Sequence, residues 1–384
     1  MNANKRWTLS AISAACIATT ASVFAAEDAP VTRAEFEELQ RQVQEAGDWR
    51  KPESHAHLAG YGAVSYIATR ASGVNNSFGE VRFNPIFHYQ YRDLMLLESE
   101  LELAIDADGT TVTKLEYLSL DLFVSDSAIL VAGKFLSPLG QYRQNLHPLW
   151  INKLPSAPAG FGEEQAVPMN EVGLQVRGGV PLGAARLNYA LYAGNGPELA
   201  ANGTGMLMPV MADGVTRDAD GRPVVGGRIG LLPIPKLEFG LSAARGRATV
   251  TINGGAPLTG DPLRDYDAYG ADLNYSTGGL RLLAEYIAQK VGASAASVAP
   301  DAAEWRAWYA QVSYLFATPG WEAVLRYADY SAPEMTRDQK QTAAGVNYWF
   351  APHVVAKLAY EFNNGDANTA ADANRALAQI AYGF

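Results

Sequence analysis

The sequence contains a single cysteine among its 384 residues, and this cysteine, Cys16, lies in an apolar N-terminal segment. Lys5 and Arg6 precede that segment and the small residues "VFAA" end it, which is the pattern of a secretory signal peptide over residues 1–25. A lipoprotein signal is disfavoured because Ser13 stands where a branched apolar residue is needed. The mature chain is therefore predicted to lack cysteine, which excludes a disulfide framework and thiol chemistry.

Long apolar runs and excess positive charge are also missing. Beyond the signal no run of 18 apolar residues occurs, so no helix is expected to span a bilayer. Two of the 30 Lys and Arg lie in the signal, and the remaining 28 stand against 40 Asp and Glu, a net charge of −12. Neutralising phosphates requires clustered Lys and Arg, so no nucleic-acid partner is expected.

Aromatic residues and glycine are abundant. The chain contains 19 Tyr, 13 Phe, 7 Trp and 36 Gly, and its mean hydropathy is close to neutral, at −0.08. A secreted, cysteine-free chain of this composition is expected to form many short strands. That combination favours an outer-membrane β-barrel, in which each strand carries only a weak sequence signal.

One helix is predicted, over residues 31–48. Thr32 and Glu35 form a capping box at its start. Apolar residues follow at the spacing of a coiled-coil seam: Phe36, Leu39, Val43 and Ala46. Two heptads are short for an isolated coiled coil. The segment is interpreted either as a periplasmic coiled coil that reinforces a homotrimer or as a loose amphipathic helix lying on a neighbour.

From residue 57 onward the period of the apolar pattern changes to two, which indicates strands. We predict a single antiparallel transmembrane β-barrel over residues 57–384, with 16 strands and 14–18 possible. The strands are expected at 57–69, 77–91, 94–106, 111–124, 128–136, 170–180, 184–193, 224–231, 236–246, 266–275, 280–290, 304–316, 321–331, 338–350, 353–362 and 374–384.

The predicted connections alternate in length. Seven are tight turns, and the eight between them are mostly longer, reaching about thirty residues at 137–169 and 194–223. Tight turns on one rim and long loops on the other are typical of an outer-membrane barrel with both chain ends in the periplasm. A soluble β-sandwich has no reason to sort its loops in this way.

Alternation also predicts which face each side chain occupies. In "RALAQIAYGF", residues 375–384, the apolar side chains share one face and Arg375 and Gln379 share the other. A charge facing lipid at mid-depth costs about 2–4 kcal/mol, so the charged face is expected to line a water-filled interior. Outward aromatic residues beside the tight turns are expected to form a girdle: Tyr275, Phe316, Trp321, Phe350 and Phe384.

The apolar last strand ending in Phe384 resembles the assembly signal of Gram-negative outer-membrane porins. Together with the signal peptide, the short coiled coil and the strand count, the chain is most similar to the phosphate-selective (O and P) type, over about residues 31–384. The resemblance implies a bacterial outer-membrane protein, a homotrimer in lipid, and some preference for anions such as phosphate. The even count of inward charges opposes a strong preference.

Sixteen strands enclose more space than side chains can fill, so a passage for small hydrophilic solutes and ions is expected. The 137–169 loop is predicted to fold inward and to narrow this passage, and a surface cap over a neighbouring protomer is the alternative. Its candidate constriction residues are Arg143, His147, Lys153, Glu163 and Glu164. The predicted pore wall includes Arg82, Glu98, Glu100, Glu102, Lys134, Arg177, Arg186, Arg281 and Arg326.

No catalytic residues, cofactor or metal site are predicted. None of the five histidines stands in a catalytic signature, and a lipid hydrolase is the least favoured function. His55 and His57 form an H-x-H pattern, but no further ligands are grouped nearby in the sequence, and His88 is expected on the wall. The alternative to a pore is a structural or adhesive barrel that is closed by its loops.

Overall fold

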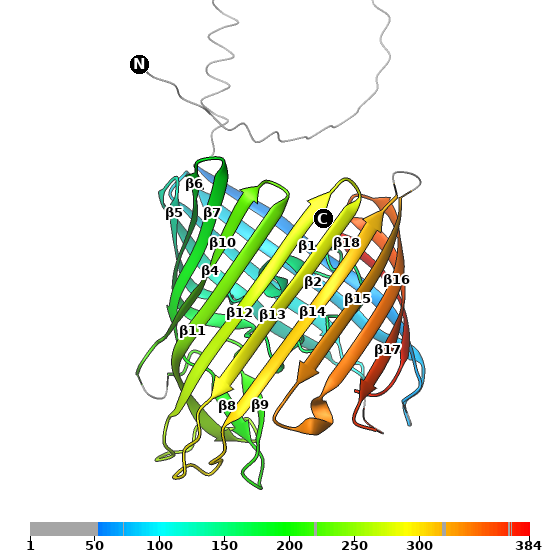
Figure 1. Cartoon of the computed structure of the whole chain (residues 1–384). Coiled ribbons are helices and arrows are strands. Elements are labelled where there is room, and N and C mark those ends of the chain that lie inside the picture. The colour runs from blue at the N-terminus through cyan, green and yellow to red at the C-terminus, as the bar shows by residue number, and fades with distance from the viewer. Residues whose placement is uncertain (1–52, 72, 219–220, 317–319, 368, 370) are drawn as a thin grey trace, which may run out of the picture. The chain divides into compact units, whose positions relative to one another are not determined.

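The computed structural model describes residues 53–384 except 72, 219–220, 317–319, 368 and 370. In this part of the chain, sixteen antiparallel strands close into a barrel, which confirms the predicted fold (Figure 1). They are β1 (Ser54–Thr69), β2 (Ser77–Tyr91), β3 (Met95–Ile105), β4 (Thr111–Ser125), β5 (Ala128–Leu136), β6 (Asn170–Leu182), β7 (Ala185–Gly194), β10 (Val224–Ile234), β11 (Leu237–Ile252), β12 (Arg264–Thr277), β13 (Leu280–Val291), β14 (Ala303–Leu315), β15 (Trp321–Ser331), β16 (Gln339–Ala351), β17 (Val354–Gly365) and β18 (Arg375–Gly383). The predicted signal peptide and coiled coil lie outside the described residues.

Pairing of β1 with β18 closes the sheet. The two strands are in register from Tyr61 opposite Gly383 to Thr69 opposite Arg375. Beyond this ladder, the Gly60 amide donates to the Phe384 carbonyl at 3.1 Å, and the Phe384 amide donates to the Gly60 carbonyl at 2.9 Å. Closure leaves the barrel without an unpaired sheet edge.

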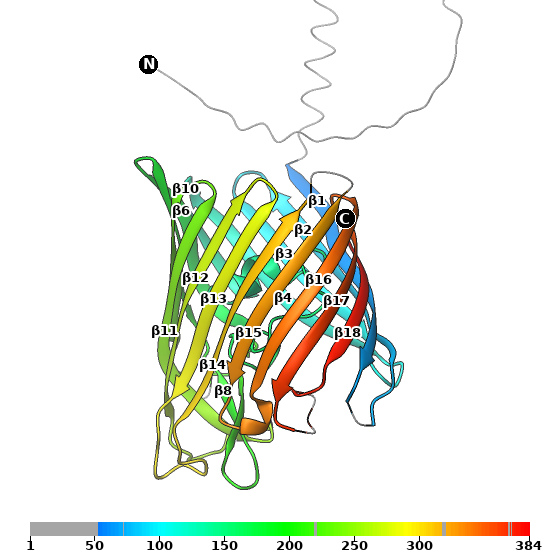
Figure 2. The ribbon, with the colours of Figure 1, turned by 45° about the vertical axis from the view of Figure 1, so that its right-hand side comes forward.

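The connections sort by rim as the sequence predicted. The seven tight turns lie at one end of the barrel, here called the short-turn rim, and the eight longer loops lie at the other, the long-loop rim (Figure 1 and Figure 2). Longest among the latter are residues 137–169, between β5 and β6, and residues 195–223, between β7 and β10. The second of these contains two short strands that the sequence did not predict, β8 (Glu198–Ala201) and β9 (Leu207–Met211).

The outer face of the barrel carries exposed apolar side chains on successive strands, for example Leu241, Leu358 and Ile380. At the short-turn rim the predicted girdle residues Phe316, Trp321, Phe350 and Phe384 are exposed and Tyr275 is partly buried. Exposed apolar side chains bordered by aromatic residues are typical of a barrel surface that faces the hydrocarbon of a membrane. Among the described residues, no helix is long and apolar enough to cross a membrane.

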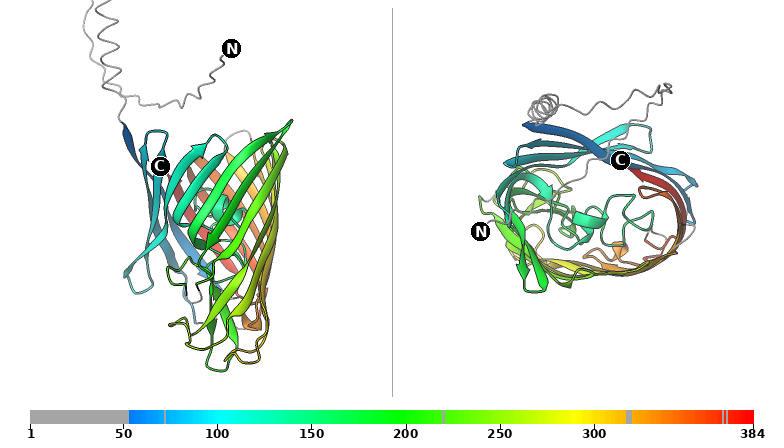
Figure 3. Two further views of the ribbon diagram at one scale, coloured as in Figure 1. Left: turned by 90° about the vertical axis from the view of Figure 1, so that its left-hand side faces the viewer. Right: turned by 90° about the horizontal axis from the view of Figure 1, so that it is seen from above.

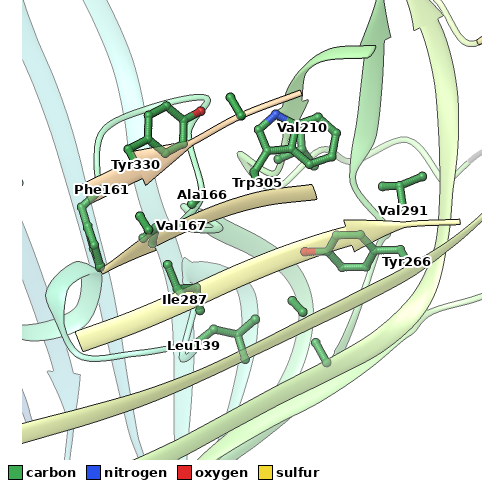
Figure 4. Close-up of a cluster of buried hydrophobic side chains, with 14 of the residues drawn as sticks. Leu139, Phe161, Ala166, Val167, Val210, Tyr266, Ile287, Val291, Trp305 and Tyr330 are labelled. Atoms are coloured by element: carbon green, nitrogen blue, oxygen red, sulfur yellow. The ribbon is translucent and has the colours of Figure 1, made fainter. Parts of the chain in front are cut away.

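Part of the barrel interior is a hydrophobic core rather than a water-facing wall. Phe161, Ala166 and Val167 of the 137–169 loop pack with Ile287 of β13 and Trp305 of β14 (Figure 4). The cluster continues to β8 and β9 through Leu199, Leu207 and Val210. Inward-facing residues on the adjoining strands are therefore apolar, which breaks the simple rule that apolar side chains face lipid.

Lys134 of β5 shows the consequence for the sequence prediction. In the register, Lys134 lies opposite Leu118, an exposed residue of the outer face, and the Lys134 ammonium donates to the Leu115 carbonyl at 2.9 Å. The buried Val131 and Phe135 face inward instead, where they join the interior core. The prediction that Lys134 lies on the pore wall is therefore wrong. It assumed that charged side chains face a uniformly wet lumen, whereas β5 turns apolar side chains inward.

The seam between β1 and β18 generates a test. Phe384→Ala removes ring contacts with Phe83, at 5.9 Å between centroids, and with Tyr382, at 6.2 Å. We expect the free energy of unfolding in lipid vesicles, measured by urea titration, to fall by about 1 kcal/mol. Phe316→Ala is the control, because Phe316 contacts Tyr314 at the same rim but lies away from the seam. An equal loss in both variants would contradict a special role for the seam.

Candidate pore constriction

The 137–169 loop leaves β5 at the long-loop rim and returns to β6 at the same rim, and between these points it lies across the barrel interior. Figure 3 (right) shows the segment, in teal, within the ring of strands. A short π-helical turn, η1 (Tyr142–Leu146), begins the segment. Leu139, Leu154 and Phe161 of the loop are almost fully buried, as expected for a segment packed inside a barrel.

Glu285 of β13 anchors the first turn of the loop. Its carboxylate accepts hydrogen bonds from the backbone amides of Gln141, at 3.1 Å, and Tyr142, at 2.9 Å. Gly140 adopts a φ of +82°, and a Cβ at this position would lie only 1.9 Å from a Glu285 oxygen. Glycine is therefore required for the loop backbone to approach this wall.

Two buried cations on the last strands hold the middle of the loop. Arg326 of β15 donates to the carbonyls of Ser156, at 3.0 Å, and Ala157, at 3.1 Å. Lys357 of β17 donates to the Leu149 carbonyl and, at 2.7 Å, to the Asn152 carbonyl. These wall cations satisfy loop carbonyls that are removed from water, which would otherwise be left unpaired.

Arg143 and Lys153, two of the predicted constriction residues, lie in ion pairs with the wall. The Arg143 guanidinium bonds Glu116 of β4. The Lys153 ammonium lies 3.0 Å from a Glu322 oxygen and 4.6 Å from the ring centroid of Trp349. Both cations are thus used to hold the loop: Arg143 pairs with a neighbour of Glu102, and Lys153 pairs with a carboxylate of β15.

The three remaining predicted loop residues differ in their surroundings. His147 lies edge-on to Tyr61, and neither ring nitrogen has a hydrogen-bond partner among the described residues. Burial lowers the pKa of His147 well below its usual range, and the charge of Arg143 adds to this effect, so the ring is neutral. Glu164, at a φ of +53°, is exposed.

Glu163 reaches toward β4. Its carboxylate accepts a hydrogen bond of 2.7 Å from the Lys114 ammonium. Burial acts to raise the pKa of Glu163, but the hydrogen bond and charge of Lys114 outweigh it and hold the pKa below its usual range. The carboxylates of Glu102 and Glu116 lie close by, and each has a cation of its own, Arg82 or Arg143.

The wall formed by β2, β3, β4 and β6, here called the open wall, keeps contact with water. The side chains of Arg82 and Arg177 are 32% and 38% exposed, whereas Arg326 and Lys357 under the loop are 0% and 1% exposed as whole residues. Arg82 and Arg177 therefore keep contact with water, although the loop also reaches this wall through Arg143–Glu116 and Glu163–Lys114.

Cations and carboxylates alternate along the open wall. Toward the long-loop rim, Arg82 pairs with Glu102 at 2.8 Å. Toward the short-turn rim, Arg177 pairs with Asp121 and lies 3.7 Å from Glu98. Between these pairs, Glu100 accepts hydrogen bonds from the Tyr61 hydroxyl, at 2.6 Å, and the Asn84 amide, at 2.9 Å. Neighbouring charges thus neutralise one another.

Two predicted wall cations have no such partner. Arg186 of β7 and Arg281 of β13 face inward by alternation with Asn188 and Leu283. In the part of the chain that the structure describes, no carboxylate lies within 4.0 Å of either guanidinium. The inward carboxylates on the strands, in contrast, each accept at least one hydrogen bond or ion pair: Glu80, Glu98, Glu100, Glu102, Glu116, Asp121, Glu171, Glu238, Asp272, Glu285, Glu322 and Glu361.

Sequence reasoning missed Lys114 and Glu116 as wall residues. The register of β3 against β4 shifts between Glu100 and Leu101, so alternation along β4 changes phase near Glu116. A bulge of this kind leaves no plain signal in a single sequence. The anchoring role of Glu285 was missed for another reason, since nothing local to β13 marks a contact with a loop 144 residues away.

Comparison with known proteins agrees with this geometry. The family model of phosphate-selective porins O and P matches residues 192–384, just over half of the chain. The chain is a porin of this family, and it forms a β-barrel channel of the bacterial outer membrane. A comparison with curated protein sequences finds no match.

Solved structures share the fold at low sequence identity. The chain is similar to an anion-selective porin from Comamonas acidovorans, with a TM-score of 0.56, 15% identity, and 86% of this chain and 100% of that one covered. Against Salmonella typhi OmpF in complex with daunomycin, the TM-score is 0.58 at 13% identity, covering 86% and 98%. A trimer form of Vibrio cholerae OmpT gives 0.53 at 14% identity, covering 87% and 100%.

Anchoring of the loop generates a second test. Lys357→Met leaves the Leu149 and Asn152 carbonyls without their donor, at a cost of about 1–3 kcal/mol to the loop conformation. We expect larger and noisier single-channel conductance and faster proteolysis within residues 137–169. Lys340→Met is the matched control, because Lys340 is exposed near the long-loop rim. Unchanged conductance in a folded Lys357→Met protein would show that this anchor does not control the pore.

Proposed function

We propose that the 137–169 loop forms the constriction of a passive channel for small hydrophilic solutes and ions. Support comes from its anchors on Glu285, Arg326 and Lys357, which hold it inside the barrel. The loop also reaches β4 through Arg143–Glu116 and Glu163–Lys114, so it crosses the lumen from one wall to the other and narrows the space that is left for solutes. A folded protein that is electrically silent in planar bilayers would instead support a structural or adhesive barrel closed by its loops.

We further propose a weak preference for anions. The charges of the open wall cancel in pairs, whereas Arg186 and Arg281 have no carboxylate partner among the described residues. Selectivity in channels depends on charges at the ion path rather than on the total charge. The matched family of phosphate-selective porins and the similarity to the anion-selective porin from Comamonas acidovorans are consistent with this direction.

The double variant Arg186→Gln, Arg281→Gln tests the preference. We expect its reversal potential under a salt gradient to shift toward cations, and the shift to fade near 1 M salt, where the Debye length is about 3 Å. Arg245→Gln is the control, since Arg245 is exposed and pairs with Asp267 near the long-loop rim. A reversal potential that stays at the wild-type value in the double variant would exclude these arginines as the source of selectivity.

Assembly as a homotrimer is part of the proposal. The OmpT neighbour is described as a trimer form, and the sequence predicts a coiled coil over residues 31–48. Deleting residues 31–48 is expected to lower the temperature at which trimers dissociate in mild detergent, with the barrel still folded. Light scattering of the purified protein gives the mass. A monomeric wild-type protein would overturn the trimer, and an unchanged dissociation temperature would remove the coiled coil from it.

A further inference from the structure

Three histidines lie together on the β1–β2 ladder near the short-turn rim. His57 lies directly opposite His88 in the register, and their rings stack at 5.6 Å between centroids. His55, two residues before His57, shares its face of β1 and lies opposite Gln90. Leu58 and Phe87 are exposed on the other face, so the histidines lie on the same face as Tyr61 and Glu100, which point into the lumen.

We propose that His57 and His88 bind a divalent transition-metal ion such as Zn²⁺ on the lumen side of the short-turn rim. The two Nδ1 atoms lie 3.4 Å apart. Zinc binds imidazole nitrogens at about 2.0–2.1 Å in tetrahedral geometry, which places two ligand atoms about 3.3–3.4 Å from one another. The ladder therefore already holds two nitrogens at the separation that a shared metal ion requires.

Glu98 of β3 supplies the support that histidine ligands usually have. The Nε2 atom of His88 lies 3.3 Å from a Glu98 oxygen. A histidine that binds metal through one nitrogen commonly donates its other N–H to a carboxylate, which fixes the tautomer and the ring orientation. With Nε2–H donating to Glu98, the Nδ1 lone pair of His88 is free to bind metal beside His57.

The remaining coordination positions are open. His57 is exposed and His88 is partly exposed, so water and the ion have access to both rings. His55 is exposed two residues earlier on the same face of β1. Two nitrogens plus water molecules would complete a four-coordinate site with exchangeable positions.

A bound dication would change the local charge of the pore. Glu98 also lies 3.7 Å from Arg177, so the proposed metal site is next to the ion pairs of the open wall. Two added positive charges near the periplasmic mouth favour anions at low salt and are screened at high salt. Metal binding at this place therefore has an electrical readout that is separate from the binding measurement.

Zinc binding to the folded protein, purified without a polyhistidine tag, tests the site. Titration with ZnCl₂ in a calorimeter is expected to give one ion bound per chain. His57→Ala and His88→Ala should each weaken binding at least about tenfold, and Glu98→Gln about 10–100-fold. His353→Ala is the control, because His353 lies in the β16–β17 turn at the same rim and outside this ladder. Heat-dependent mobility on gels checks that each variant is folded.

The same proteins in planar bilayers give the second readout. ZnCl₂ added to both chambers should shift the wild-type reversal potential toward anions, and this shift should be absent in His57→Ala and His88→Ala. Absence of zinc binding to wild type would overturn the site, even in a conducting pore. Binding that survives both substitutions, or that His353→Ala weakens equally, would also overturn it. A silent channel that still binds zinc through His57 and His88 would reject the proposed pore and keep the metal site.

Discussion

Backbone amides and carbonyls that face hydrocarbon need partners within the protein, and the pairing of β1 with β18 supplies the last of them. This requirement is met when the strands close into a ring. Closure also fixes which side chains of each strand point inward, because a slip by one residue would turn the inward charges toward lipid. The interior is consequently too wide for the wall side chains to fill, and a separate segment is needed to occupy it.

The 137–169 loop meets that need in two chemically different ways. Against β13 and β14 it packs apolar side chains, and its backbone is held by Glu285. Against β15–β17 it relies on buried cations that donate to its carbonyls, and Lys153 pairs with Glu322. Buried charges are stable only with such partners, so removing one partner disturbs the whole contact. On the open wall, Arg82 and Arg177 keep contact with water, whereas their carboxylate partners Glu102 and Asp121 are largely buried.

Strand positions and the alternation of turn lengths could be predicted from the sequence because both depend on local patterns of period two. Phe384 at the seam followed from the same pattern. The contacts of Arg143 and Lys153 could not be predicted, because they depend on which of many carboxylates lies opposite after folding. The prediction for Lys134 was wrong for a related reason, because β5 borders an apolar part of the interior that cannot be recognised from the local sequence. The pairing of His57 with His88 became visible only with the register of β1 against β2.

The wall residues that hold the loop lie far from it along the chain: Asn152 and Lys357 are separated by 205 residues, and Gln141 and Glu285 by 144. Contacts this distant can form only when both segments are present, and closing the intervening chain costs entropy. The loop therefore cannot take its final conformation until β13–β17 are in place. A barrel that lacked these strands would leave the loop unanchored, and its opening would be wider than that of the complete channel.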